Sequence, residues 1–249
     1  MAEEEKATSR TLRKNDIKTF VIRIDILSND SMIIDTIIGK LSPLFDRIEK
    51  RIIEGVSIEI TNGQPAFKKT EDYDYVLVSE KKNLSMIFSK AQNAFWLETS
   101  AYQDNSTYKD IFEEVNRIFL EVWPTAISKR IGMRFINEFK CQTTSEIKRV
   151  FKLKKANIVL GILDDTNISR AIAYQEYNTD GRKSRVQYGI ANKYYPAVIS
   201  SFDLVLDIDV YFDTNIPLEE WSVKISDLNH TAYDHFIETM NEKYLLGLK

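Results

Sequence analysis

Four aspartates on one face of a predicted strand are the side chains best suited to chemistry in this sequence. Residues 202–213 read FDLVLDIDVYFD, so Asp203, Asp207, Asp209 and Asp213 share one parity while apolar residues fill the other. Neighbours two positions apart on a strand face are separated by about 7 Å, where two carboxylates repel by about 0.6 kcal/mol in water. Such a face needs solvent, nearby cations or a bound metal ion.

Two interpretations of this acidic face stay open. In the first, the face forms a divalent-cation site like those of nucleases and nucleotidyl transferases, because hard cations prefer carboxylate oxygens. The ligands would be Asp203, Asp207 and Asp209. In the second, which we favour, the face is solvated and the basic residues 182–185 of the preceding hairpin offset the repulsion. The second interpretation requires no cofactor.

A basic amphipathic run follows the middle of the chain. The sequence KRVFKLKK at 148–155 includes Lys148, Arg149 and Lys152, and it predicts a short basic helix over Ser145–Leu153. Several cations within a few turns form a footprint that phosphates of nucleic acid would fit. The same pattern is typical of the solvated face of a surface helix, which is the interpretation we favour.

Further candidate binding residues lie on two other strands. Arg130, Arg134 and Asn137 are the polar members of RIGMRFIN, and we expect them to pair with carboxylates at a strand end more readily than to hold a ligand. Arg185 and Tyr188 belong to a tyrosine-rich segment. Tyrosines beside arginines are typical of recognition surfaces, because aromatic rings bury much area at small entropic cost.

The residue types that most catalytic designs require are scarce. The 249 residues include one cysteine (Cys141), two histidines (His230 and His235) and eight glycines without a phosphate-loop pattern. The histidines are five positions apart, a spacing that directs them to different helix faces and excludes a shared zinc ion. We expect Cys141 to be a buried, unreactive thiol, and we predict no catalytic residue.

Composition indicates a globular protein without a global electrostatic field. The chain is 43% hydrophobic and 29% charged with a net charge of -3, so any nucleic-acid contact must come from a local patch. The apolar runs are too short to cross a bilayer, and we recognise no secretion signal. We therefore expect a cytoplasmic protein without membrane contact, with a flexible tail over residues 1–15.

Periodicity predicts strands and helices in two loosely similar halves. The first half (16–140) has strands at 17–27, 52–61, 73–79, 84–88, 94–101 and 131–139, a charged loop at 68–72, a helix with a bend near Pro43 that reaches Ile48, and a long helix from Ser106 to Pro124. The second half (141–249) has strands at 168–177, 184–191 and 202–212 and a closing helix capped by Ser226 or Asp227. These elements predict an α+β protein with antiparallel sheets and a few long helices packed on one face, forming one compact unit.

Several of these segments together resemble a known family. They are the opening strand and helix, RIGMRFIN at 130–137, LVLDIDVYFD at 204–213 and LNHTAYDHFIETMNEKY at 228–244. The chain resembles a sporadically distributed, functionally uncharacterised family of bacterial cytosolic proteins, although Phe135 stands where we expect tyrosine in that family. The resemblance implies an accessory role, such as toxin neutralisation or phage defence, and it brings no catalytic residues with it.

Two hypotheses about function follow from the sequence. The first is a non-enzymatic module that recognises another protein, and it also accommodates a homo-oligomer. The alternative is a metal-dependent enzyme acting on nucleic acid, with the aspartate-lined strand as its metal site and the lysines near position 150 as phosphate contacts.

Overall fold

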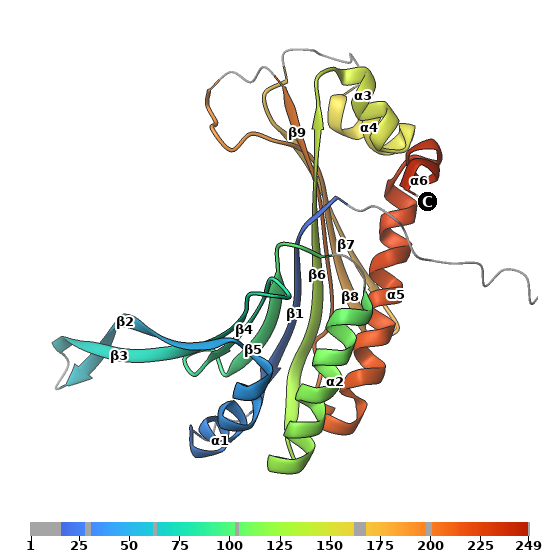
Figure 1. The fold of residues 1–249 in the computed structure, drawn as a ribbon. Helices are drawn as coiled ribbons and strands as arrows, with labels where there is room; N and C mark the ends of the chain where they lie inside the picture. The colour runs from blue at the N-terminus through green and yellow to red at the C-terminus, as the bar shows by residue number, and fades with distance from the viewer. Residues whose placement is uncertain are drawn as a thin grey trace, which may run out of the picture.

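The protein is an α+β structure built on a single antiparallel sheet (Figure 1). The computed structural model describes residues 16–27, 31–61, 64–102, 105–161, 168–197 and 201–248. The strands are β1 (Ile17–Ile26), β2 (Arg47–Thr61), β3 (Gln64–Ser79), β4 (Leu84–Ser89), β5 (Ala94–Thr99), β6 (Ile127–Cys141), β7 (Ala171–Thr179), β8 (Arg182–Ala191), β9 (Phe202–Phe212) and β10 (Ile216–Pro217). The α-helices are α1 (Ser31–Leu41), α2 (Asn105–Val122), α3 (Thr144–Val150), α4 (Leu153–Leu160), α5 (Trp221–Thr239) and α6 (Glu242–Leu248).

The two halves of the chain have a similar order of elements. The sheet runs β2-β3-β4-β5-β1-β6-β9-β8-β7, with β10 beside β6. In each half the first strand (β1 or β6) lies beside the last long strand (β5 or β9), helical segments follow the first strand, and a long helix (α2 or α5) comes after the last long strand. The two halves join where β1 pairs with β6, with Ile22 opposite Met133. The sheet is therefore continuous through both halves.

Helices cover only one face of the sheet. In β1 the side chains of Phe20, Ile22, Ile24 and Ile26 are buried, whereas the residues between them are partly accessible. The buried set joins apolar residues of α1, α2 and α5 in one hydrophobic core. The opposite face of the central strands has no helix over it in the described part of the chain, and we call it the open face (Figure 1).

A buried tryptophan ties the last helix to the sheet and to α2. Trp221, the first residue of α5, is fully buried and its indole N–H donates to the Ile216 carbonyl at 3.2 Å. Its ring packs 5.9 Å from Phe95 of β5 and 5.5 Å from Phe119 of α2. Because aromatic rings bury large areas, this cluster fixes both long helices on the same face.

Several predicted element bounds are wrong. The first helix ends at Leu41, followed by a 3₁₀ turn over Ser42–Leu44, so Ile48 belongs to β2. Pro43 accounts for this ending because proline lacks the N–H that a continuing helix needs. The charged segment 68–72, predicted as a loop, lies inside β3. The closing helix begins at Trp221 rather than at Ser226 or Asp227.

The basic segment also differs from its prediction. Two helices, α3 and α4, replace the single helix expected over Ser145–Leu153. Phe151 separates them, and it is fully buried and forms a bridge to Met240. The predicted tail at residues 1–15 lies outside the described residues.

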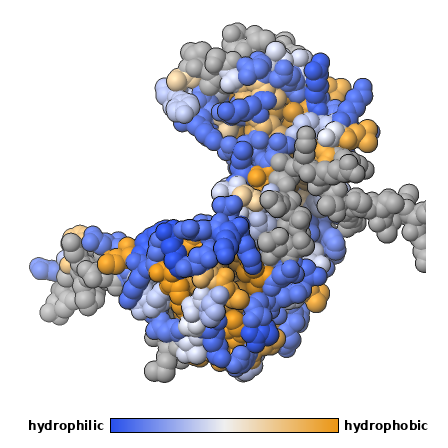
Figure 2. Space-filling model, in the orientation of Figure 1, coloured by the Kyte–Doolittle hydropathy of each residue, from blue (hydrophilic) through white to orange (hydrophobic). Residues whose placement is uncertain are grey.

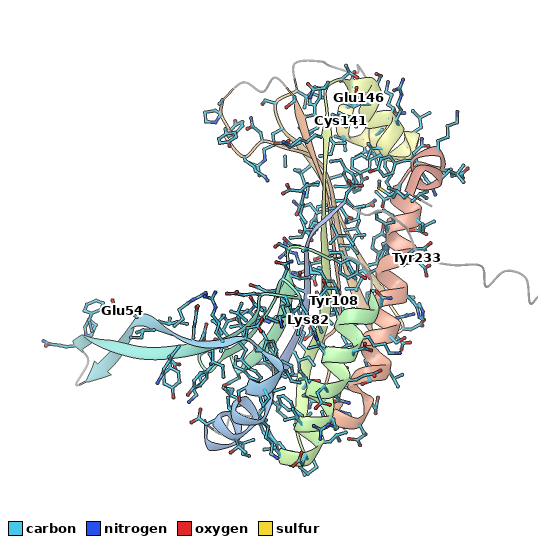
Figure 3. All side chains as sticks on the ribbon, viewed as in Figure 1. Glu54, Lys82, Tyr108, Cys141, Glu146 and Tyr233 are labelled. Atoms are coloured by element: carbon cyan, nitrogen blue, oxygen red, sulfur yellow. The ribbon has the colours of Figure 1, made fainter. Side chains whose placement is uncertain are left out.

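The strands β2 and β3 form a long ribbon that projects from the body (Figure 1). The β3–β4 pairing covers only Asp74–Ser79 of β3, so residues 52–61 and 64–73 pair only with each other within the described chain. We call this two-stranded part the arm. Glu54, two residues beyond the base of the arm, already lies on the projecting ribbon away from the helices (Figure 3). No helix of the described structure is long and apolar enough to span a membrane.

Gly189 and Gly39 provide a matched pair of stability predictions. At Gly189 the backbone φ is +148°, and an added Cβ would lie 2.0 Å from the Ala171 carbonyl oxygen, so Gly189→Ala should lower the free energy of unfolding by about 2 kcal/mol or more. Gly39 is exposed in α1 and has open space around it. Gly39→Ala should therefore raise the free energy of unfolding by about 0.5–1 kcal/mol. Urea denaturation followed by circular dichroism measures both. Equal effects of the two substitutions would contradict the described geometry of β8.

Candidate functional site

The open face brings together charged residues from four neighbouring strands. Along β9 the apolar residues from Leu204 to Val210 are buried towards the helices, and Asp207 and Asp209 project to the open face, as the alternation predicts. In the register, Arg134 of β6 and Arg185 of β8 both lie directly opposite Asp209. The predicted acidic face is therefore flanked by basic residues on both sides.

Two arginines of β6 neutralise the aspartates of β9. The Arg134 guanidinium donates to both carboxylate oxygens of Asp207, at 2.9 and 2.6 Å. Arg130 donates to Asp209 at 3.2 Å. The aspartates are the more buried members, with side-chain exposures of 13% and 20%. These pairs confirm that Arg130 and Arg134 contact carboxylates.

Burial and ion pairing shift the pKa values of Asp209 and Arg134. Burial raises the pKa of Asp209, and the nearby Arg130 and Arg134 oppose that rise. The hydrogen bonds to Asp207 raise the pKa of Arg134. Because Arg134 is half exposed, its pair with Asp207 contributes little to stability, and its main effect is to hold the guanidinium in place.

Aromatic rings lie beneath the arginines of the open face. Tyr211 of β9 lies between two guanidinium groups, 4.5 Å from Arg130 and 5.5 Å from Arg185. Across the β1–β6 junction, the guanidinium of Arg23 on β1 lies 5.4 Å from the Trp96 ring of β5. Arginine stacked on an aromatic ring is a pairing that recurs at protein interfaces.

A hollow of about 210 Å³ lies at the centre of the open face. Its walls include Arg23, Trp96, Arg130 and Arg134, and Gly132 lies among them. A Cβ on Gly132 would lie 3.2 Å from the Tyr211 Cβ, so glycine at this position leaves the bottom of the hollow free of a side chain. Figure 2 shows the molecule hollowed between its upper and lower parts, on the side away from α5. The volume is below that of typical small-molecule pockets and suits one inserted side chain.

Asp203 lies in a second hollow, apart from Asp207 and Asp209. This hollow, of about 220 Å³, is lined by residues of β6, β7, β8 and β9 that include Glu138 and Gln187, and by Lys193 just after β8. Lys193 forms an ion pair with Glu138 at 2.9 Å. Nowhere in the described residues do three acidic, histidine or cysteine side chains gather closely enough to hold a metal ion. The three aspartates predicted as one metal site are thus split between two places.

The other predicted binding residues are not on the open face. Tyr188 and Asn137, predicted as surface residues, are buried on the helix-covered side, where Asn137 donates to the Leu206 carbonyl at 3.2 Å. These two predictions are wrong because both residues share strand parity with apolar neighbours. The basic residues Lys148, Arg149 and Lys152 lie in and between α3 and α4, which pack on the helix-covered side.

Sequence reasoning missed Arg23, Trp96, Glu98 and Gly132. Their strands contain the signal that would have found them. In β1, Arg23 has the parity opposite to the buried isoleucines, and in β5 Trp96 alternates with the buried Phe95 and Leu97. What the sequence does not encode locally is that β1 and β5 lie beside β6 and β9.

A second group of polar residues lies partly buried between α4, α5 and the sheet. The Lys155 ammonium donates to Gln175 at 2.6 Å and lies 5.0 Å from the Tyr188 ring, and burial lowers its pKa. The Tyr188 hydroxyl has no hydrogen-bond partner among the described residues. His235 packs 4.9 Å from the Tyr177 ring, and burial lowers the pKa of this histidine.

The single cysteine is buried at the end of β6, close to Glu146 of α3 (Figure 3). Burial raises the pKa of the Cys141 thiol to about 11. The thiol is therefore protonated at neutral pH and unsuited to nucleophilic chemistry, as the sequence indicated.

Comparison with known proteins identifies no relative of this chain: no family model matches it, and no curated protein matches its sequence. The assignment of function therefore depends on the geometry of the described residues.

His235 should make stability depend on pH. In the folded protein burial keeps the ring neutral, whereas the unfolded chain binds a proton near the ordinary pKa of 6.5. The free energy of unfolding should be unaffected by this group above pH 6.5. It should fall below that pH by at most about 1.4 kcal/mol per unit, until the folded protein also takes up the proton.

Denaturation series between pH 7.5 and 5.5 measure this slope. His235→Gln should flatten it, while His230→Gln, which removes an exposed histidine from the same helix, should leave it unchanged. A slope that survives His235→Gln would contradict the assignment.

Proposed function

We propose that this protein is a non-enzymatic recognition module that binds another protein through its open face. The observation that carries the proposal is a helix-free sheet face on which arginines lie against Trp96 and Tyr211 around a hollow the size of one side chain. Tryptophan, tyrosine and arginine are the residues that most often dominate binding energy at protein interfaces. Rigid strands hold all of them, so little conformational entropy is lost on binding.

The charge balance of the open face favours a protein over a nucleic acid. Arg23, Arg130, Arg134 and Arg185 each form an ion pair, with Asp25, Asp209, Asp207 and Glu176 respectively. A phosphate backbone needs unbalanced positive charge and would be repelled by these carboxylates. A protein surface with charges of both signs can pair with arginines and aspartates at once.

The basic residues of α3 and α4 do not change this choice. They lie across the sheet from the open face, so they cannot supply phosphate contacts to a ligand bound there. The metal-dependent alternative required Asp203, Asp207 and Asp209 in one site, but Asp203 and Asp209 line different hollows and Asp207 is held by Arg134. We therefore do not propose an enzyme. The resemblance noted in the sequence adds a prediction about context, namely that the bound protein is a toxin or a component of phage defence.

Affinity purification of the tagged chain from its native host tests the proposal. A defined protein should co-purify in near-stoichiometric amount, and Arg134→Ala or Trp96→Ala should each reduce its recovery at least tenfold, as expected for interface hot spots. Arg149→Ala is the matched control, because it removes an exposed arginine from the helix-covered side and should have no effect.

Two outcomes would contradict the proposal. One is recovery of nucleic acid, or of no stoichiometric protein, with the unaltered chain. The other is a partner whose recovery is unchanged by both open-face substitutions, provided that thermal melting shows the variants to be folded.

A further inference from the structure

The arm is a long two-stranded ribbon that no third strand of the described chain stabilises. Residues 52–61 and 64–73 form a two-stranded ribbon of about 33 Å with no third strand in the described structure. Isolated two-stranded ribbons are marginally stable in water. Among the described strands β2 pairs only with β3, so the other edge of its fifteen residues has no strand beside it in the described structure.

The arm also continues the core face of the sheet beyond the helices. Its residues of even number in β2 share a face with Tyr75 and Leu77, which pack into the hydrophobic core. Farther along the arm this same face carries Ile52 and Phe67, 66% and 74% exposed. Apolar side chains of this size on an uncovered strand indicate that another surface packs there.

We propose that the edge of β2 is a dimerisation strand and that its occupant is β2 of a second copy of this chain, paired antiparallel about Ile52. Residues directly opposite one another share a face, so a continuous sheet of two copies pairs residues of equal parity. Centred on Ile52, the register places Lys50 opposite Glu54 of the second copy and Glu54 opposite Lys50 of the second copy. This surface is separate from the open face and does not depend on it.

Charge is compatible with this register and disfavours several neighbouring ones. Centring on Lys50, Arg51 or Glu54 places identical charges opposite each other, whereas the centre at Ile52 gives two opposite-charge pairs and no like-charge pair. Such cross-strand pairs stabilise sheets. Centring on Ile53 would pair Arg47 with Glu59 instead, and charge exchange at positions 50 and 54 distinguishes the two registers. Lys50 is held on the required face by the Tyr73 ring, 3.5 Å from its ammonium.

The same register explains why the arm projects. Ile52 lies one residue beyond Arg51, the last residue of β2 that is backed by both β3 and β4. Each arm would therefore lie along the rooted part of β2 in the other copy. The register pairs residues 52–57 of each arm with residues 47–52 of the other copy, all within β2. This part of the arm thus gains the third strand that its own described chain does not supply.

Sedimentation equilibrium of the full chain tests the proposal through a charge exchange. The unaltered chain should be a dimer at micromolar concentration. Lys50→Glu alone and Glu54→Lys alone should each weaken dimerisation at least tenfold, because each creates two like-charge pairs. The double variant carrying both substitutions should dimerise again. A monomer at 100 µM of the unaltered chain, or single variants that dimerise as well as the unaltered chain, would overturn the proposal.

A cross-linking experiment tests the register independently of stability. Ile52→Cys places two thiols on directly opposite residues, whose Cα atoms lie about 4.5–5.5 Å apart, within disulfide range, so oxidation should give a covalent dimer. Ile60→Cys is the matched control, because its two copies would be about 50 Å apart. The native Cys141 is buried and should not interfere. Equal cross-linking of the two variants, or none for Ile52→Cys, would contradict the register.

Discussion

Side chains alternate between the two faces of each strand, and the helices of this protein cover only one of those faces. This constraint determines the chemistry of both sides. On the covered face, residues such as Phe20, Ile24 and Trp221 form one core with α1, α2 and α5. On the open face the same strands must carry side chains that tolerate water, and they carry arginines, aspartates and aromatic rings. The open face is thus as much a product of the alternation as the core is.

The α+β fold class could be predicted from the sequence because it depends on local periodicity. The alternation of β9 and the apolar stripe of α2 each involve residues within one element, and both predictions are confirmed. The arm was missed because its charges at 68–72 resemble those of a loop, and a solvent-exposed ribbon carries the same residue types. Helix bounds failed at Trp221, where burial against Phe95 and Phe119, and not a capping side chain, sets the start.

The candidate site was only half visible in the sequence. Asp207, Asp209, Arg130 and Arg134 were identified, but their pairing depends on β6 lying beside β9, a contact across about seventy residues. Tyr188 is a candidate binding residue by type, because tyrosines beside arginines are typical of recognition surfaces, although its parity with Val186 and Ile190 indicates the core. Whether a polar residue of a strand is buried depends more on its parity than on its residue type. The predictions for Tyr188 and Asn137 are wrong because they give residue type more weight than parity.

The seam between the two halves has a consequence for whatever occupies the central hollow. Ile22 of β1 lies opposite Met133 of β6, and in each strand the next residue is an arginine, Arg23 or Arg134. Because the strands are antiparallel, Arg23 and Arg134 occupy backbone positions related by an approximate dyad that passes through the Ile22–Met133 pair, and both residues line the hollow. A ligand segment would therefore meet an arginine whichever way its chain runs across the seam, so the recognition of chain direction must come from residues farther out, where the two halves differ.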